Sequence, residues 1–176
     1  GGISAWCILT GRQPQFFAQS LKVILAVAIA VAPLQIFIGH LSAEQVSVHQ
    51  PAKLAAMEAL WETVPAETPA AWSVVALPND KAEKNDWEFS IPGALSYILE
   101  LKPRLDKPIQ GLKAWEPRNR PHMVGLIYYS FRIMVAIGLF FAALIAVTTL
   151  QWLRGKLQGD QISQQRWLLR AWVFAA

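Results

Sequence analysis

Two charged residues in the middle of the chain could carry out proton-coupled chemistry. Lys53 and Glu58 lie in a predicted helix over residues 51–62, which has Pro51 in its first turn. Their spacing of five residues puts them on different sides of that helix, so they are not an ideal ion pair, but such groups can reach around one bound headgroup. Glu62 follows Glu58 by one turn, and in a dry site this like charge would raise the pKa of Glu58 towards neutrality, where a carboxylate can accept and release protons. The alternative is that Lys53 and Glu58 are solvated positions on an amphipathic helix.

A second candidate site lies in a long apolar run, where a cation and a sulfur atom stand close in sequence. Arg132 would be costly in hydrocarbon and is expected to have a partner. Met134 follows two residues later and points in a different direction on a helix. Its thioether could be an axial ligand to haem iron, with Arg132 paired with a haem propionate. Ordinary packing is the alternative for Met134. The three histidines lie at or outside the ends of the apolar runs: His40, His49 and His122. They therefore offer no second iron ligand within those runs.

The elements that must position these residues are membrane helices, and the sequence predicts two complete ones. The chain is 54% hydrophobic and only 16% charged, with a mean hydropathy of +0.31. Residues 12–39 and 122–153 are each long enough to span roughly 30 Å of hydrocarbon. Residues 1–11 look like the end of an earlier membrane helix and residues 166–176 like the start of a later one, so we expect an internal fragment of a longer protein. The predicted fold class is all-α, a multi-pass transmembrane helix bundle.

The region between the spans, residues 40–121, is expected to form a long extracytoplasmic loop that contains short helices. Besides the helix over residues 51–62, a second one is predicted over residues 92–101. Residues 77–86 are expected to be turn-rich and solvated. The basic residues that flank the spans lie on one side, and by the positive-inside tendency this makes residues 154–165 a cytoplasmic loop.

Several function classes are not favoured by the composition. The single Cys7 excludes a multi-cysteine zinc or iron–sulfur site within the chain. The net charge is +4, but no basic run is interleaved with aromatic residues, so no nucleic-acid partner is predicted. Phosphate-binding, dinucleotide-binding and hydrolase motifs are absent from the sequence. Trp6 and Trp167 lie near predicted span ends, where indole rings favour the headgroup zone.

The chain resembles subunit I of the cytochrome bd-type quinol oxidases of bacteria. The resemblance covers essentially the whole chain, and two motifs in combination make it specific: Gln50-Pro-Ala-Lys-Leu-Ala-Ala-Met-Glu58 with Trp61-Glu-Thr63, and Phe131-Arg-Ile-Met-Val-Ala136. Further matching residues are Gly2-Ile-Ser-Ala-Trp6, Gly11-Arg12, Ile91-Pro92, Ala94-Leu95, Gly111-Leu-Lys113 and Trp167-Leu-Leu-Arg-Ala171. The brief stretch from Leu112 to Pro121 resembles the short-loop branch, which includes the cyanide-insensitive oxidases.

The resemblance implies specific roles for the candidate residues. The loop would be the Q loop, which oxidises ubiquinol or menaquinol on the periplasmic side of the bacterial inner (plasma) membrane, with Lys53 and Glu58 acting in quinol oxidation. Met134 would be an axial ligand of the low-spin haem b iron, with Arg132 beside that haem. Electrons would pass on to a high-spin haem b and haem d, where oxygen is reduced to water. Subunit II of the oxidase and membrane lipid are the other implied partners.

The resemblance also implies limits on this chain. The remaining haem ligands are expected outside it, so the fragment alone is not expected to be a competent quinol:oxygen oxidoreductase. His40 stands where an aspartate is expected in familiar members, which argues against a proton-exit role there.

An alternative of a different class is a membrane transporter or scaffold subunit that binds an anionic ligand through Arg132 and the loop charges. Such a protein is expected to have discontinuous helices or inverted repeats around the site. Pro33 could support a broken helix, but the sequence has no second half related to the first. Haem absorbance of the full-length protein separates this alternative from the oxidase.

Overall fold

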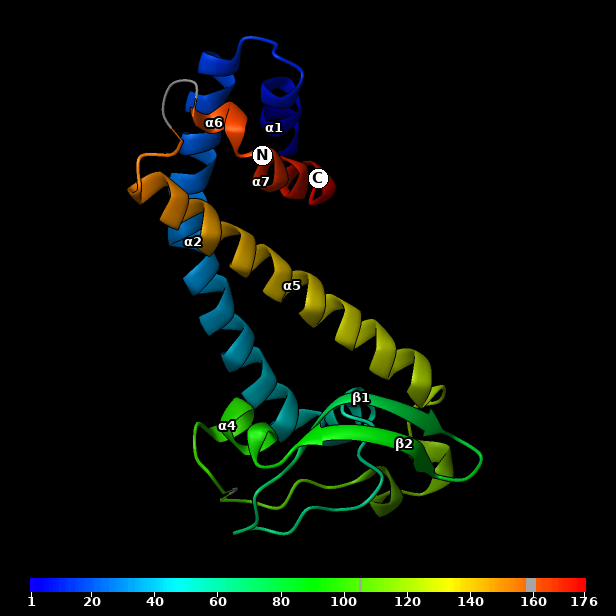
Figure 1. Ribbon diagram of the computed structural model, residues 1–176. Coiled ribbons are helices and arrows are strands. Elements are labelled where there is room, and N and C mark those ends of the chain that lie inside the picture. Colours follow the sequence, from blue (N-terminus) through cyan, green and yellow to red (C-terminus); the bar gives the residue numbers. More distant parts are fainter. Residues whose placement is uncertain (105, 158–160) are drawn as a thin grey trace. The chain divides into compact units, whose positions relative to one another are not determined.

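The chain forms two compact units in a computed structural model that describes residues 1–104, 106–157 and 161–176 (Figure 1). Unit 1 comprises Gly1–Ile36 and Ala136–Ala176, and unit 2 comprises Phe37–Val135. Two long helices, α2 (Pro14–His49) and α5 (Val124–Leu153), contribute residues to both units. All four predicted site residues therefore belong to unit 2.

Both long helices are apolar enough to cross a membrane. The segments that meet this criterion by length and composition are Pro14–His49 and Pro117–Leu153. Helix α2 runs through Pro33 without a break, and it continues to His49, so the first residues of the predicted loop are helical. The helix ends there because Gln50 precedes a proline, which disfavours the α conformation at residue 50.

Unit 1 packs three short helices with parts of the two long ones. The short helices are α1 (Gly2–Leu9), α6 (Gln161–Gln164) and α7 (Arg166–Phe174). Its core is built from leucines of α2, α5 and α7, among them Leu21, Leu144 and Leu168. Residues 158–160 of the predicted cytoplasmic loop lie outside the described residues.

Unit 2 is not all helical, and the all-α prediction is wrong in this respect. Its helical elements are α3 (Pro51–Met57), α4 (Ala94–Glu100), η1 (Leu112–Ala114) and η2 (Pro117–Asn119). Between α3 and α4 the chain forms an antiparallel hairpin of β1 (Trp72–Asn79) and β2 (Lys84–Ile91), visible as the paired arrows of Figure 1. The second predicted loop helix is confirmed, whereas the first is shorter than predicted.

The hairpin replaces most of the predicted solvated segment 77–86, because only its turn lies outside the strands. A signal for β2 was present in the sequence: Trp87, Phe89 and Ile91 alternate with polar residues, which is the period of a strand with two different faces. The turn-forming and charged residues around Asn79 obscured this alternation.

Candidate functional site

The centre of the candidate site is a buried ion pair between Glu58 and Arg132. Arg132 Nη2 donates to Glu58 Oε2 at 2.6 Å, and Nη1 donates to Oε1 at 3.3 Å. The Glu58 side chain is only 6% exposed and the Arg132 side chain 11%. The expected partner of Arg132 is therefore a carboxylate of the loop, and this pair joins α5 to the end of α3.

The backbone at the end of α3 places Glu58 at the C-cap of the helix. Ala59 follows in the left-handed conformation, with φ of 49°. The N–H of Leu60 bonds the carbonyl of Ala55 at 2.8 Å, and the N–H of Ala59 bonds that of Ala56. This is a Schellman-type helix end with alanine where glycine is usual, and it stops the helix short of the predicted residue 62.

Arg132 is held on its other side by the hairpin. Its Nε donates to the carbonyl of Ser73 at 2.8 Å, and the Tyr128 hydroxyl donates to the same carbonyl at 3.0 Å. The guanidinium also lies over aromatic rings, with its carbon 4.7 Å from the ring centre of Tyr128 and 5.2 Å from that of Trp72. The orientation of the guanidinium is therefore fixed by hydrogen bonds and by stacking.

Strand β1 has two irregularities in its pairing with β2, and they lie at the carbonyls that accept hydrogen bonds from side chains of α5. The register with β2 shifts between Ser73 and Val75 and again between Ala76 and Pro78. The carbonyl of Ala76 accepts the hydroxyl of Tyr129 at 2.8 Å, as that of Ser73 accepts its donors. A bulge leaves backbone groups unpaired within the sheet. We infer that the bulged strand makes these carbonyls available to α5.

One polar side chain of the hairpin, Asn85, ties it to the segment that carries Glu58. Asn85 Nδ2 donates to the carbonyl of Ala59 at 3.1 Å and to Glu88 Oε2 at 2.8 Å. Asn85 Oδ1 accepts the indole N–H of Trp61 at 2.9 Å, and the Ser73 hydroxyl donates to Glu88. Sequence reasoning missed Asn85 and Ser73. Asn85 had no local motif, and the Ser73 carbonyl is a backbone group that every residue has.

The pKa of Glu58 is raised above its ordinary value of 4.5 because burial disfavours the carboxylate, although the hydrogen bond and the charge of Arg132 act in the opposite direction. The predicted cause was the like charge of Glu62, and that cause is wrong. The Glu62 side chain is 75% exposed and accepts a hydrogen bond from Lys113 Nζ at 2.5 Å. Desolvation by the surrounding protein is therefore the reason for the raised pKa.

Lys53 and Met134 are placed differently from the ion pair. Lys53 is exposed on α3, and in the part of the chain that the structure describes no hydrogen bond or ion pair joins it to Glu58. Met134 is 61% exposed, on the side of α5 that also exposes Ile133 and Ile137. As predicted, Arg132 and Met134 point in different directions, because one is buried against the loop and the other is not.

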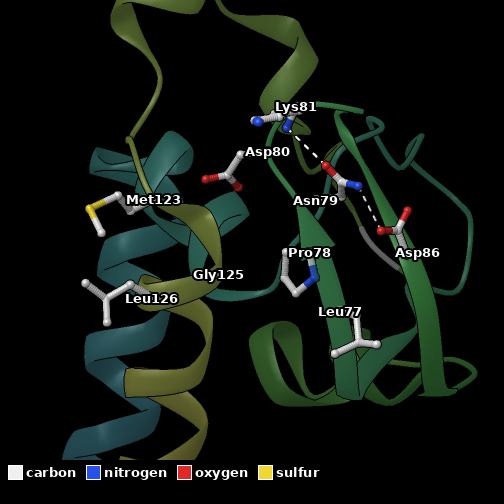
Figure 2. Close-up of a pocket in the computed structure, with 9 residues that line it drawn as sticks. All are labelled: Leu77, Pro78, Asn79, Asp80, Lys81, Asp86, Met123, Gly125 and Leu126. Carbon is white, nitrogen blue, oxygen red and sulfur yellow. Dashed lines mark hydrogen bonds between the residues drawn. The ribbon is translucent and has the colours of Figure 1, made fainter.

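An open groove of about 480 Å³ lies beside the tip of the hairpin, at the start of α5 (Figure 2). Its lining residues are Leu77, Pro78, Asn79, Asp80, Lys81, Asp86, Met123, Gly125 and Leu126. Asn79 bonds Asp86 at 2.8 Å and the backbone N–H of Lys81 at 3.2 Å, as the dashed lines of Figure 2 show, and Asp80 accepts the N–H of Val124. The groove contains none of the predicted site residues, and both of its carboxylates already accept hydrogen bonds, Asp86 from the Asn79 side chain and Asp80 from the backbone N–H of Val124.

Comparison with known proteins gives a consistent result. The sequence model described as cytochrome bd terminal oxidase subunit I matches residues 1–176. The chain is 30% identical over 180 residues to cytochrome bd ubiquinol oxidase subunit 1 of Bacillus subtilis (strain 168), covering 98% of the chain and 36% of the relative. It is 28% identical over 234 residues to cytochrome bd-II ubiquinol oxidase subunit 1 of Escherichia coli (strain K12), covering 96% of the chain and 43% of the relative.

Similar coverage is found for a third relative and for a solved structure. A putative cytochrome bd menaquinol oxidase subunit I of Bacillus subtilis is 31% identical over 158 residues, covering 90% of the chain and 33% of the relative. The structure of bd oxidase from Geobacillus thermodenitrificans is similar with a TM-score of 0.78 and 25% identity, covering 99% of this chain and 38% of that one. The chain thus spans well under half the length of the relatives it matches.

Proposed function

Because this chain belongs to the family of cytochrome bd terminal oxidase subunit I, we propose that its loop oxidises a quinol and that α5 helps to hold the haem that receives the electrons. The observation that carries this proposal is the buried pair of Glu58 and Arg132. A buried carboxylate with a raised pKa, fixed by a cation on a membrane helix, is suited to taking protons at the membrane edge.

Quinol oxidation must separate protons from electrons. Each quinol that becomes a quinone loses two protons and two electrons, and Glu58 accepts a proton from a quinol hydroxyl in the proposed reaction. Its raised pKa brings the carboxyl closer to neutrality, which favours both acceptance and release of that proton. Arg132 holds the carboxylate in one orientation, and Ser73 in turn holds Arg132.

Lys53 has a different role in the proposed site. It is exposed and has a long flexible side chain, so it is available to a quinol oxygen arriving from the membrane. Because it is not held by Glu58, its contribution is to bind the headgroup, and its loss is expected to affect KM more than kcat.

Among the residues of α5, Met134 fits the binding of a haem. Met134 presents a soft thioether on an exposed apolar side of the helix, where a flat apolar cofactor can pack. Arg132 already has Glu58, Ser73 and Tyr128 as partners, so its proposed place beside the haem rests on the family resemblance. When bound, the low-spin haem b would accept the quinol electrons one at a time. The high-spin haem b and haem d, with oxygen reduction to water, belong to the proposed whole enzyme.

The family and the lengths of the alignments support the remaining parts of the proposal. Relatives are described as ubiquinol and menaquinol oxidases, and both quinols are candidate substrates. The alignment with the Escherichia coli relative is longer than this chain, so that relative has additional residues, and we propose that they lie in its Q loop. Subunit II is the proposed partner, and the loop is proposed to face the periplasm of the bacterial inner membrane. Family membership argues against the transporter or scaffold alternative.

A reduced-minus-oxidised optical spectrum of membranes that contain the full-length protein tests the haem assignment. Met134→Leu is expected to remove or shift the low-spin haem b signal and to leave the other haem signals in place. Met123→Leu is the matched control, because Met123 is also exposed, at 62%. An unchanged spectrum in Met134→Leu would show that this residue only packs, and the absence of any haem would favour the transporter or scaffold.

Turnover with a quinol substrate tests the loop assignment. Lys53→Ala and Glu58→Ala are expected to impair quinol oxidation while haem content is retained. Lys84→Ala, at the start of β2, and Glu67→Ala are controls at exposed positions of unit 2. Wild-type turnover in both site variants would contradict the proposed quinol site.

A further inference from the structure

A second groove lies in unit 1, between α1 and α7, and it has no role in the quinol site. It encloses about 300 Å³ and is lined by Trp6, Leu9, Thr10, Arg166, Arg170 and Val173. The two helices pack side by side in Figure 1. The groove therefore combines two guanidinium groups with an apolar wall.

The two arginines act from one face of α7. Arg166 and Arg170 are four residues apart, which places them on the same side of the helix. Both are exposed, and no hydrogen bond or ion pair engages either side chain within the described ranges of the chain. The opposite side of α7 is buried through Leu168 and Trp172, so the arginine face is fixed towards the groove.

The described residues of unit 1 include no acidic side chain that could neutralise these arginines. The sequence of this unit contains one acidic residue, Asp160, which lies outside the described residues. Its basic residues are Arg12, Lys22, Arg154, Lys156, Arg166 and Arg170. A ligand for this groove is therefore expected to be an anion.

The walls of the groove indicate what kind of anion. Leu9 and Val173 give it apolar sides, and the indole of Trp6 is 54% exposed. An indole with one apolar face and one polar edge favours the boundary between hydrocarbon and headgroups. A small inorganic anion would use the arginines but would leave these apolar sides uncovered. An amphiphile uses both.

The connections of the helices place this groove at one end of both spans. Residues 10–13 join α1 to the start of α2, and α7 follows the end of α5. The groove thus lies at the end of the spans that carries the basic flanking residues, where anionic lipids and basic clusters attract one another. We propose that the groove between α1 and α7 binds the phosphate headgroup of an anionic phospholipid through Arg166 and Arg170, with an acyl chain against Leu9 and Val173.

The test uses the complete purified oxidase in vesicles that contain a photoactivatable phosphatidylglycerol. Labelling is expected on the peptide that contains Trp6 and Leu9. The double variant Arg166→Gln/Arg170→Gln should reduce it by roughly 100-fold, because each direct hydrogen bond to a charged group typically changes affinity by about tenfold or more. The control is Arg154→Gln/Lys156→Gln, which removes the same charge at the same end but outside the groove, and it should change labelling by less than about twofold.

Four results would overturn the proposal. Equal losses in the two double variants would indicate a general surface attraction, and equal labelling by photoactivatable phosphatidylcholine would show that the phosphate charge is not recognised. Full protection by inorganic phosphate alone would identify a site for free phosphate. Failure of the groove variant to assemble would show in its haem content. In that case the wild-type protein gives the test, and absence of label from its Trp6 peptide overturns the proposal. None of these readouts depends on quinol turnover.

Discussion

Replacing Arg132 with methionine should release the segment that carries Glu58 from α5. Methionine keeps most of the length of the side chain but removes both bonds to the carboxylate, which is 6% exposed. The carbonyl of Ser73 keeps the Tyr128 hydroxyl as a donor, so the main loss is the stranded carboxylate. Removing one partner of a buried ion pair typically costs about 3–5 kcal/mol. The population of the released segment should therefore rise by roughly a hundredfold or more.

Amide hydrogen exchange measures this population directly. The relevant probe is the amide of Leu60, which bonds the carbonyl of Ala55 at 2.8 Å and closes the end of α3. Its exchange rate should rise in Arg132→Met by the same factor as the open population. The double variant Arg132→Met/Glu58→Gln should recover most of the protection, because it leaves no unpaired charge in the site.

The matched control is a second arginine–glutamate pair at the surface. Arg118 Nε bonds Glu116 Oε2 at 2.9 Å, and the two side chains are 81% and 66% exposed. Because exposed pairs contribute little, Arg118→Met should leave the exchange of the Leu60 amide within about threefold. An equally small change in Arg132→Met would refute the argument that this ion pair fixes the loop to the helix.

Three further predictions follow from the same unit. The pKa of Glu58 is higher in the folded protein than its ordinary value of 4.5, so its contribution to stability is fully present below that value and is lost as pH rises through the raised pKa. Protection of the Leu60 amide, corrected for intrinsic exchange, should therefore fall over that pH window in the wild type and not in Glu58→Gln. Gly111→Ala should destabilise unit 2 by about 1–3 kcal/mol in thermal unfolding, since a Cβ there would lie 2.2 Å from the carbonyl carbon of Glu62, whereas Gly125→Ala, which meets open space, should be neutral or slightly stabilising. Asn85→Ala leaves the Trp61 indole N–H without its acceptor and should lower stability by about 1–3 kcal/mol, with a changed tryptophan fluorescence as the accompanying signature; unchanged unfolding and fluorescence would contradict this role.

The features that could be predicted from the sequence are those that a single segment determines. The long apolar helices follow from runs of hydrophobic residues, and the need of Arg132 for a partner follows from the cost of a charge in such a run. The identity of that partner could not be predicted in the same way, because Glu58 is 74 residues away and no local pattern links the two. The interpretation of Glu58 as a candidate proton acceptor rested on its neighbour Glu62, whereas the physical reason is burial.

The hairpin illustrates a different limit. The alternation in β2 was readable, but β1 mixes Pro78 with two register shifts and shows no clean period. Its contribution to the site is also made by backbone carbonyls of Ser73 and Ala76. Since every residue carries a carbonyl, only the three-dimensional arrangement reveals which ones receive the side chains of α5.

The separation between Glu58 and Arg132 also sets the order in which the site can be assembled during biosynthesis. The ribosome delivers Glu58 74 residues before Arg132, so the carboxylate is made long before its counter-ion exists. Until α5 has been inserted into the membrane, the segment after α3 has neither the guanidinium nor the tyrosine donors that dock it. A nascent chain therefore has no Glu58–Arg132 pair, and the proposed quinol site can form only after α5 has been made.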